Sequence, residues 1–402
     1  MDTIVGDVIG LLVAAVAVAL IAHRLRLPYS VGLVLSGAAL AASRVATGPV
    51  LTHDLIFELA LPPVLFEAAI NIRWSELRRD WAPVLLLAIV GTVAAAGLVA
   101  VGVIEMLGWP APDGLLFGAL IAATDPVAII AMFKDNDTSE GDRGRLRLLV
   151  ESESLFNDGV AAVLFTMLLP LASASATPSF GAVTETLLLT VGGGLATGVA
   201  CALLMILLVG RTADHLVESA LTAVVAYGSF VLAERLHGSG VLATVAAGLT
   251  IGNLGILAEV DERISKRGRE FALALWEFIA FIANSLLFLL IGLAVAGVRF
   301  DRLGGASLVV ILMLVLGARA LTVYPTCLLF RGSRWSIPTR SQHVLWWGGL
   351  RGALGIALAL SLPTTLAYRA EILVATFTVV VFSVVVQGMT MPLLLPRRQG
   401  RG

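Results

Sequence analysis

The stretch Thr124-Asp125-Pro126 interrupts an apolar segment at residues 114–133, and Glu153-Ser154-Leu155-Phe156-Asn157-Asp158 lies inside the next apolar segment, at residues 148–172. Each segment is long enough to cross a lipid bilayer, which takes about 20 apolar residues. A charged side chain at the middle of a bilayer costs about 2.5–3.5 kcal/mol even on lenient scales. Several carboxylates held at that depth therefore indicate a site that handles ions or protons.

The composition identifies the broad class of protein. Of the 402 residues, 58% are hydrophobic and 14% are charged, whereas soluble proteins average about 45–50% apolar and about 25% charged residues. We therefore expect a polytopic protein embedded in the lipid bilayer. The net charge of -1 offers no basic surface for nucleic acid. Cys201 and Cys327 lie in separate apolar segments without metal-ligand spacing, and we interpret both as packing residues.

Thirteen apolar segments predict an all-α fold of about thirteen transmembrane helices. If the amino terminus lies outside and the carboxyl terminus in the cytoplasm, 20 of the 27 Lys and Arg residues fall in cytoplasmic connections and five fall outside, as the positive-inside rule requires. The first segment follows acidic rather than basic residues, so we expect a retained helix and not a cleaved signal. The segments are 4–22, 29–49, 54–71, 82–107, 114–133, 148–172, 181–209, 215–233, 239–257, 270–297, 305–330, 342–366 and 370–395.

We expect residues 1–402 to form one membrane domain with no soluble regulatory domain. We expect this multi-pass protein to lie in the cell (inner or plasma) membrane.

Two segments contain helix breakers. Pro126 lacks an amide hydrogen, so the fifth segment should open near Thr124, and the glycines of residues 348–352 should interrupt the twelfth. Paired interrupted segments are typical of transporters built from inverted repeats. We therefore predict two inverted six-helix repeats, about 1–173 and 215–396, joined by a linking helix at 181–209.

At 100° per residue, the polar side chains of the sixth segment form two stripes. Glu151, Ser154 and Asp158 share one stripe, which could coordinate a cation, and Glu153 and Asn157 share the other, which could pair with a second helix. An unpaired buried charge is costly, so we predict that Glu153 pairs with Arg351 in the interrupted twelfth segment.

Other intramembrane polar residues leave alternatives open. For Arg319 and Glu277 we predict a second buried ion pair, between the tenth and eleventh segments. Asp125 could cap the broken helix as well as bind an ion. Glu67 could line the pathway without coordinating the ion, and Glu151 could be a funnel charge.

Four stretches resemble the monovalent cation:proton antiporters of the NhaP type, which are bacterial and archaeal relatives of the sodium/proton exchangers. They lie on the third, fifth, sixth and twelfth segments, in the family's order, and the resemblance covers nearly the whole chain. Ser152 is a departure, because the family usually has glycine there. The stretches are Leu61-Pro62-Pro63-Val64-Leu65-Phe66-Glu67-Ala68, Ala123-Thr124-Asp125-Pro126-Val127-Ala128, Glu151-Ser152-Glu153-Ser154-Leu155-Phe156-Asn157-Asp158-Gly159 and Gly348-Gly349-Leu350-Arg351-Gly352-Ala353.

The resemblance implies a role for each matching residue. Asp158 would bind a sodium ion and a proton in turn, with Ser154, Glu67, Asp125 and the backbone carbonyl of Thr124 completing the oxygen shell. Asn157 would be the hydrogen-bonding neighbour of Asp158, and its pairing with aspartate implies electroneutral exchange of one cation for one proton. Glu153 and Arg351 would form the family's structural ion pair. The resemblance also implies a homodimer.

Elementary chemistry leads to the same mechanism. Burial and neighbouring carboxylates favour the neutral form of a carboxylic acid, so a proton and a cation would compete for Asp158. Oxygen ligands without sulfur or imidazole suit an alkali ion, and we expect no cofactor besides the transported Na+ and H+. The alternatives are Li+ or K+ as the cation and, less favoured because no repeated filter is visible, a passive cation channel. The sequence has no His-Glu-x-x-His or Gly-x-Ser-x-Gly motif, so we do not expect an enzyme.

Overall fold

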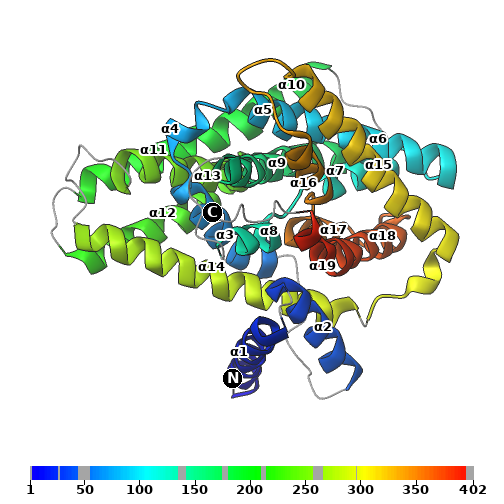
Figure 1. Ribbon diagram of the computed structural model, residues 1–402, viewed down its shortest axis with the longest axis horizontal. Helices are drawn as coiled ribbons and strands as arrows, with labels where there is room; N and C mark the ends of the chain where they lie inside the picture. Colours follow the sequence, from blue (N-terminus) through cyan, green and yellow to red (C-terminus); the bar gives the residue numbers. More distant parts are fainter. Residues whose placement is uncertain are drawn as a thin grey trace, which may run out of the picture.

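The computed structural model describes residues 2–25, 28–43, 55–134, 142–173, 180–209, 214–256, 266–295 and 297–394. Across these ranges the regular secondary structure is helical, with no β-strand (Figure 1). The predicted all-α class is therefore confirmed for the described chain. Of the basic residues used to predict orientation, seven lie outside the described residues: Arg26, Arg44, Arg211, Arg263, Arg397, Arg398 and Arg401.

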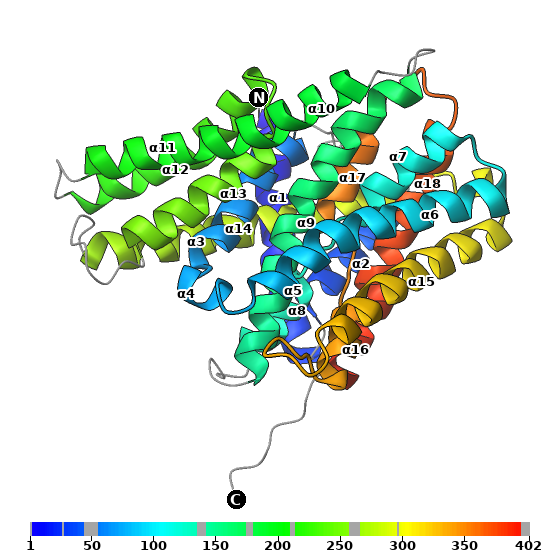
Figure 2. The ribbon, with the colours of Figure 1, turned by 90° about the horizontal axis from the view of Figure 1, so that it is seen from above.

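The helices pack as two groups on either side of the long helix α9 (Asp142–Ser173), which runs through the middle of the molecule (Figure 2). In one group, α1 and α2 pack on α14, and α3, α11 and α12 surround α13. The other group contains the interrupted helices. The first group comprises α1 (Asp2–Leu25), α2 (Tyr29–Ala42), α3 (Leu61–Asn71), α11 (Gly194–Val209), α12 (His215–Arg235), α13 (Gly240–Ile251) and α14 (Lys266–Val295). The second comprises α5 (Trp81–Leu85), α6 (Thr92–Leu107), α7 (Ala111–Ala122), α8 (Val127–Lys134), α15 (Gly305–Leu329), α16 (Thr339–Trp347), α17 (Ala353–Leu360) and α18 (Arg369–Phe382).

Short elements extend or connect these helices. Several π-helical turns join neighbouring helices into one rod, so that α5 and α6 run on as a single apolar helix. The short helices are α4 (Trp74–Leu77), α10 (Phe180–Leu188) and α19 (Gly388–Thr390); the π-helical turns are Leu55–Ala60, Leu86–Gly91, Leu189–Gly193, Gly252–Ile256 and Ser383–Gln387; and the 3-10 turns are Phe300–Arg302 and Met391–Leu393.

Seven helices of the described ranges are long and apolar enough to cross a membrane, and four shorter apolar helices accompany them. This finding confirms a multi-span membrane protein. The count of thirteen spans, the two inverted repeats, the domain limits and the orientation of the ends stay predictions. The seven are Trp81–Leu107, Arg143–Ser173, Thr184–Val209, His215–Arg235, Lys266–Val295, Gly305–Leu329 and Arg369–Leu393.

Both predicted interruptions are present. Helix α7 ends at Ala122 and α8 begins at Val127, which leaves residues 123–126 non-helical around Pro126. Helix α16 ends at Trp347 and α17 begins at Ala353, which leaves the glycine-rich residues 348–352 non-helical. Both interruptions lie in the described chain at the positions where the backbone chemistry disfavours a helix.

The two interruptions touch each other. The amide of Asp125 donates a hydrogen bond of 2.7 Å to the carbonyl oxygen of Leu350, so a donor released by one break pairs with an acceptor released by the other. A Cβ atom at Gly352 would overlap the Asp125 carboxylate. Glycine at this position therefore allows the two breaks to cross.

We expect Gly352→Ala to lower the thermal stability of the detergent-solubilised protein, because the added methyl group must displace Asp125; overpacking of this kind costs about 1–3 kcal/mol. Gly317→Ala is the matched control, since a Cβ atom there meets no neighbour within 4 Å. In helix α15 that control should be neutral or slightly stabilising. Equal melting temperatures for the two variants would contradict the close crossing.

Candidate functional site

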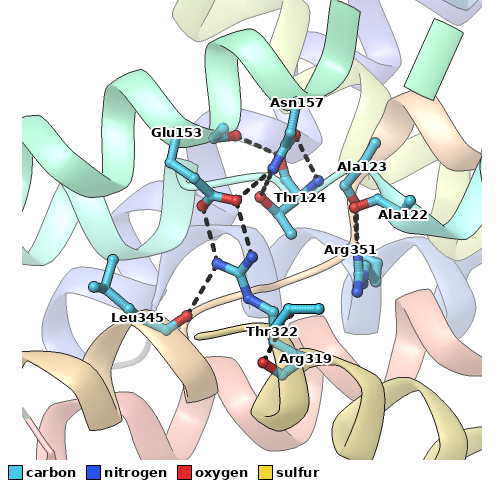
Figure 3. Close-up of polar contacts among 10 residues, drawn as sticks. Ala122, Ala123, Thr124, Glu153, Asn157, Arg319, Thr322, Leu345 and Arg351 are labelled. Carbon is cyan, nitrogen blue, oxygen red and sulfur yellow. Dashed lines mark hydrogen bonds and ion pairs between the residues drawn. The ribbon is translucent and has the colours of Figure 1, made fainter. Parts of the chain in front are cut away.

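The strongest polar contact of the site is a buried ion pair between α9 and α15 (Figure 3). The guanidinium of Arg319 donates from Nη1 to Glu153 Oε1 and from Nη2 to Glu153 Oε2, both at 2.9 Å. Nη2 also donates to the carbonyl oxygen of Leu345 at 3.1 Å. The side chains are only 8% and 3% exposed. A two-pronged pair of this kind neutralises the Glu153 charge within the protein.

The predicted partners of these charges were wrong. Glu153 pairs with Arg319 and not with Arg351, and Arg319 is therefore not the partner of Glu277. The helical phase of Glu153 placed it on a stripe beside that of Asp158, but the phase does not say which neighbouring helix supplies the arginine. Glu277 lies instead in the wall of a cavity.

Arg351 makes its contacts elsewhere, at the carboxyl end of α7. Its Nη1 donates to the carbonyl oxygens of Ala122 and Ala123, the latter at 2.9 Å, and the residue is 3% exposed. The last carbonyls of a helix have no partner within the helix and carry partial negative charge. Arg351 therefore caps the carboxyl end of α7 where Pro126 has opened the helix.

Asn157 ties α9 to the same break. Its Oδ1 accepts from the amide of Thr124 at 3.1 Å, and its Nδ2 donates to Thr124 Oγ1 at 2.7 Å and to Glu153 Oε1 at 2.9 Å (Figure 3). The residue is fully buried. All these contacts point to the break and to Glu153, so the side chain holds the broken backbone in place beside Asp158.

A cavity of about 1000 Å³ brings together the other predicted ligands. Asp158, Ser154, Thr124, Asp125 and Glu67 all line it. The hydroxyl of Ser154 donates to the carbonyl oxygen of Thr124. The cavity therefore brings together oxygen-bearing residues from α9, from the α7–α8 break and from α3.

Two details refine the predicted shell. Asp125 Oδ1 accepts from the amide of Val127 at 2.9 Å, so the capping role considered for Asp125 is present. Glu67 Oε1 accepts from Asn71 Nδ2 at 3.1 Å on α3. Within the described residues, no three Asp, Glu, His or Cys side chains converge closely enough to share one metal ion. Glu67 therefore lines the cavity with its carboxylate held by Asn71.

Sequence reasoning missed the residues that complete the second break. Ser383 Oγ accepts from the amide of Arg351 at 3.0 Å, and Gln387 Nε2 donates to the carbonyl oxygen of Trp347 at 2.9 Å. Both residues are buried. Polar side chains four residues apart in an otherwise apolar segment were the available signal, because such residues share one helix face.

Interrupted helices that cross beside buried carboxylates and a cavity define the architecture of a secondary transporter. Residues 11–397 match the protein family described as "Sodium/hydrogen exchanger, transmembrane". The chain belongs to this family of transporters, and the resemblance to NhaP-type antiporters is confirmed.

The relatives and solved structures agree with this assignment. The chain is 40% identical over 380 residues to the Na+/H+ antiporter ApNhaP of Aphanothece halophytica, covering 92% of this chain and 70% of the relative. It is 32% identical over 403 residues to the Na+/H+ antiporter NhaH of Halobacillus dabanensis, covering 96% of each. The structure of the sodium proton antiporter MjNhaP1 from Methanocaldococcus jannaschii superposes with a TM-score of 0.77 at 20% identity, covering 98% of both chains, and shows the same fold.

We expect Glu153→Gln and Arg319→Gln each to destabilise the solubilised protein by about 3–5 kcal/mol, because each leaves the other charge buried and uncompensated. The double variant should lose clearly less than the sum, as a double-mutant cycle of melting temperatures would reveal. The exposed pair Arg299 and Asp301 serves as control and should show no measurable coupling. Additive effects at Glu153 and Arg319 would contradict the pairing.

Proposed function

We propose that this protein exchanges a monovalent cation for H+ across a membrane, and that the cation is Na+. We further propose that both ions compete for Asp158. One observation carries the proposal. Of the carboxylates on α9, Glu153 is neutralised by Arg319 and Glu151 pairs with Arg147, whereas no Lys, Arg or His of the described residues forms an ion pair with Asp158. Asp158 faces the cavity beside the α7–α8 break.

A lone carboxylate in this position must be neutralised before it can change sides. A bare charge near the middle of the membrane is costly, so Asp158 would cross only with a proton or a cation bound. The two ions then exclude each other, which makes exchange obligatory. Alkali cations suit the oxygens that surround the site, and we propose Asp158, Asp125, Ser154 and the carbonyl of Thr124 as ligands, with Glu67 acting from the cavity wall.

The choice of Na+ follows the relatives named above, which are described as Na+/H+ antiporters. The resemblance also leads us to propose a homodimer in the cell membrane, with alternating access at the crossing of the two interrupted helices. Dye-based proton flux with Na+, Li+ and K+ in turn would identify the cation. A flux of K+ alone would favour a K+/H+ antiporter of the same fold, and cation flux uncoupled from protons would favour a channel.

We expect Asp158→Asn to reduce cation-dependent proton flux in proteoliposomes to the background level, because the amide binds no proton at working pH and has no negative charge to neutralise a cation. The melting temperature and elution volume should stay near those of the parent protein. Asp301→Asn is the matched control, since it makes the same chemical change at an exposed residue, and its flux should be unchanged. Full exchange by Asp158→Asn would refute the mechanism.

The stoichiometry can be tested separately. If Asp158 carries either one proton or one monovalent cation, the crossing states have equal charge and exchange is electroneutral. A potential of 100 mV changes the energy of one transported charge by about 2.3 kcal/mol, so an electrogenic cycle would respond strongly. We expect the flux measured under an imposed potassium diffusion potential to be the same for either sign of the potential. A clear dependence on sign would refute one-for-one exchange.

A further inference from the structure

The cavity-facing stripe of α9 contains a cation as well as carboxylates. Arg147, Glu151, Ser154 and Asp158 follow one another at intervals of four, three and four residues, and all four line the cavity. This spacing places them on one face of the helix that runs through the middle of the molecule (Figure 2). Arg147 Nε lies 3.4 Å from Glu151 Oε2. The stripe therefore begins with an ion pair and ends at the proposed ion site.

The two members of the pair differ in depth. The side chain of Arg147 is 38% exposed and that of Glu151 is 12% exposed, so the arginine is the more open to solvent. The other charged residues that line the cavity are all acidic: Glu67, Asp125, Asp158 and Glu277. Arg147 is thus the one basic residue among the lining residues of the described chain. A fixed positive charge in this place opposes the cation that the other side chains attract.

We propose that Arg147 and Glu151 form an electrostatic regulator of cation access, in which Arg147 lowers and Glu151 raises the apparent affinity for the transported cation. This inference rests on the exchange function proposed above and deepens it. Neither residue has to touch the bound ion. The pair acts through the field in the cavity, where charged groups with low-dielectric walls change the local concentration of ions.

The size of the effect follows from distance. Arg147 lies eleven positions before Asp158, which corresponds to about 16 Å along the helix axis. In open water at physiological salt the screening length is about 8 Å, so the influence would be small, but a cavity within protein is screened less. We expect changes of about two- to fivefold in the KM for the cation, with little change in the maximal rate.

The experiment compares Arg147→Gln, Glu151→Gln and the double variant in sealed membrane vesicles of both orientations. Arg147→Gln should lower the KM for Na+ about two- to fivefold, Glu151→Gln should raise it by a similar factor, and the double variant should return close to the parent value. Arg147→Lys should keep the parent KM because it keeps the charge. Arg78→Gln is the matched control: it removes one exposed positive charge outside the lining residues and should leave KM unchanged.

Salt and sidedness separate this field effect from a structural role. The KM shifts should shrink when ionic strength is raised with choline chloride, and they should occur only when Na+ is varied on the side of the membrane where α9 begins, which we expect to be cytoplasmic. Shifts that persist at high salt, that are equal from both sides, or that change the maximal rate alone would overturn the inference. Parent protein without cation-coupled proton flux would refute the proposed function, whereas parent exchange with an unshifted Arg147→Gln would refute only the regulator.

Discussion

The crossing of two interrupted helices is the constraint on which the site depends. Hydrocarbon offers no hydrogen-bonding partner for an open backbone, so every group freed at residues 123–126 and 348–352 needs a partner within the protein. The two breaks supply part of this need to each other through the Asp125 amide and the Leu350 carbonyl. Arg351 donates hydrogen bonds to the free carbonyl oxygens at the carboxyl end of α7. The proposed ion site thus lies beside backbone that is satisfied only because the two interrupted helices cross here.

The charges around the crossing divide into those that hold the structure and those that face the cavity. Arg319 and Glu153 are buried and held by several hydrogen bonds. Asn157 links this ion pair to the first break by hydrogen bonds to Glu153 and to Thr124. Asp158, one residue further along α9, faces the cavity instead. The Asn-Asp dipeptide therefore places a structural residue and a titratable residue side by side, because consecutive residues of a helix point about 100° apart.

Several features were predictable because they depend on local chemistry. The apolar segments, the break at Thr124-Asp125-Pro126 and the glycine-rich break before Ala353 follow from hydrophobicity, from proline and from glycine propensity, all of which act within a few residues. The division of α9 into two polar faces follows from helical phase. Five of the six predicted ion-binding residues line one cavity, whereas the sixth, Asn157, bonds to Thr124 and Glu153 instead.

The pairing of charges between helices was decided only by the tertiary structure. The sequence by itself determined that Glu153 needs a buried cation, but two intramembrane arginines were available, and the choice depends on which helix crosses α9 at that depth. Helix α15 brings Arg319 to Glu153, while the extended backbone before α17 carries Arg351 to the end of α7. The physical reason is that a side-chain pair requires a distance of a few ångströms, and distances between helices are set by packing, which no local pattern encodes.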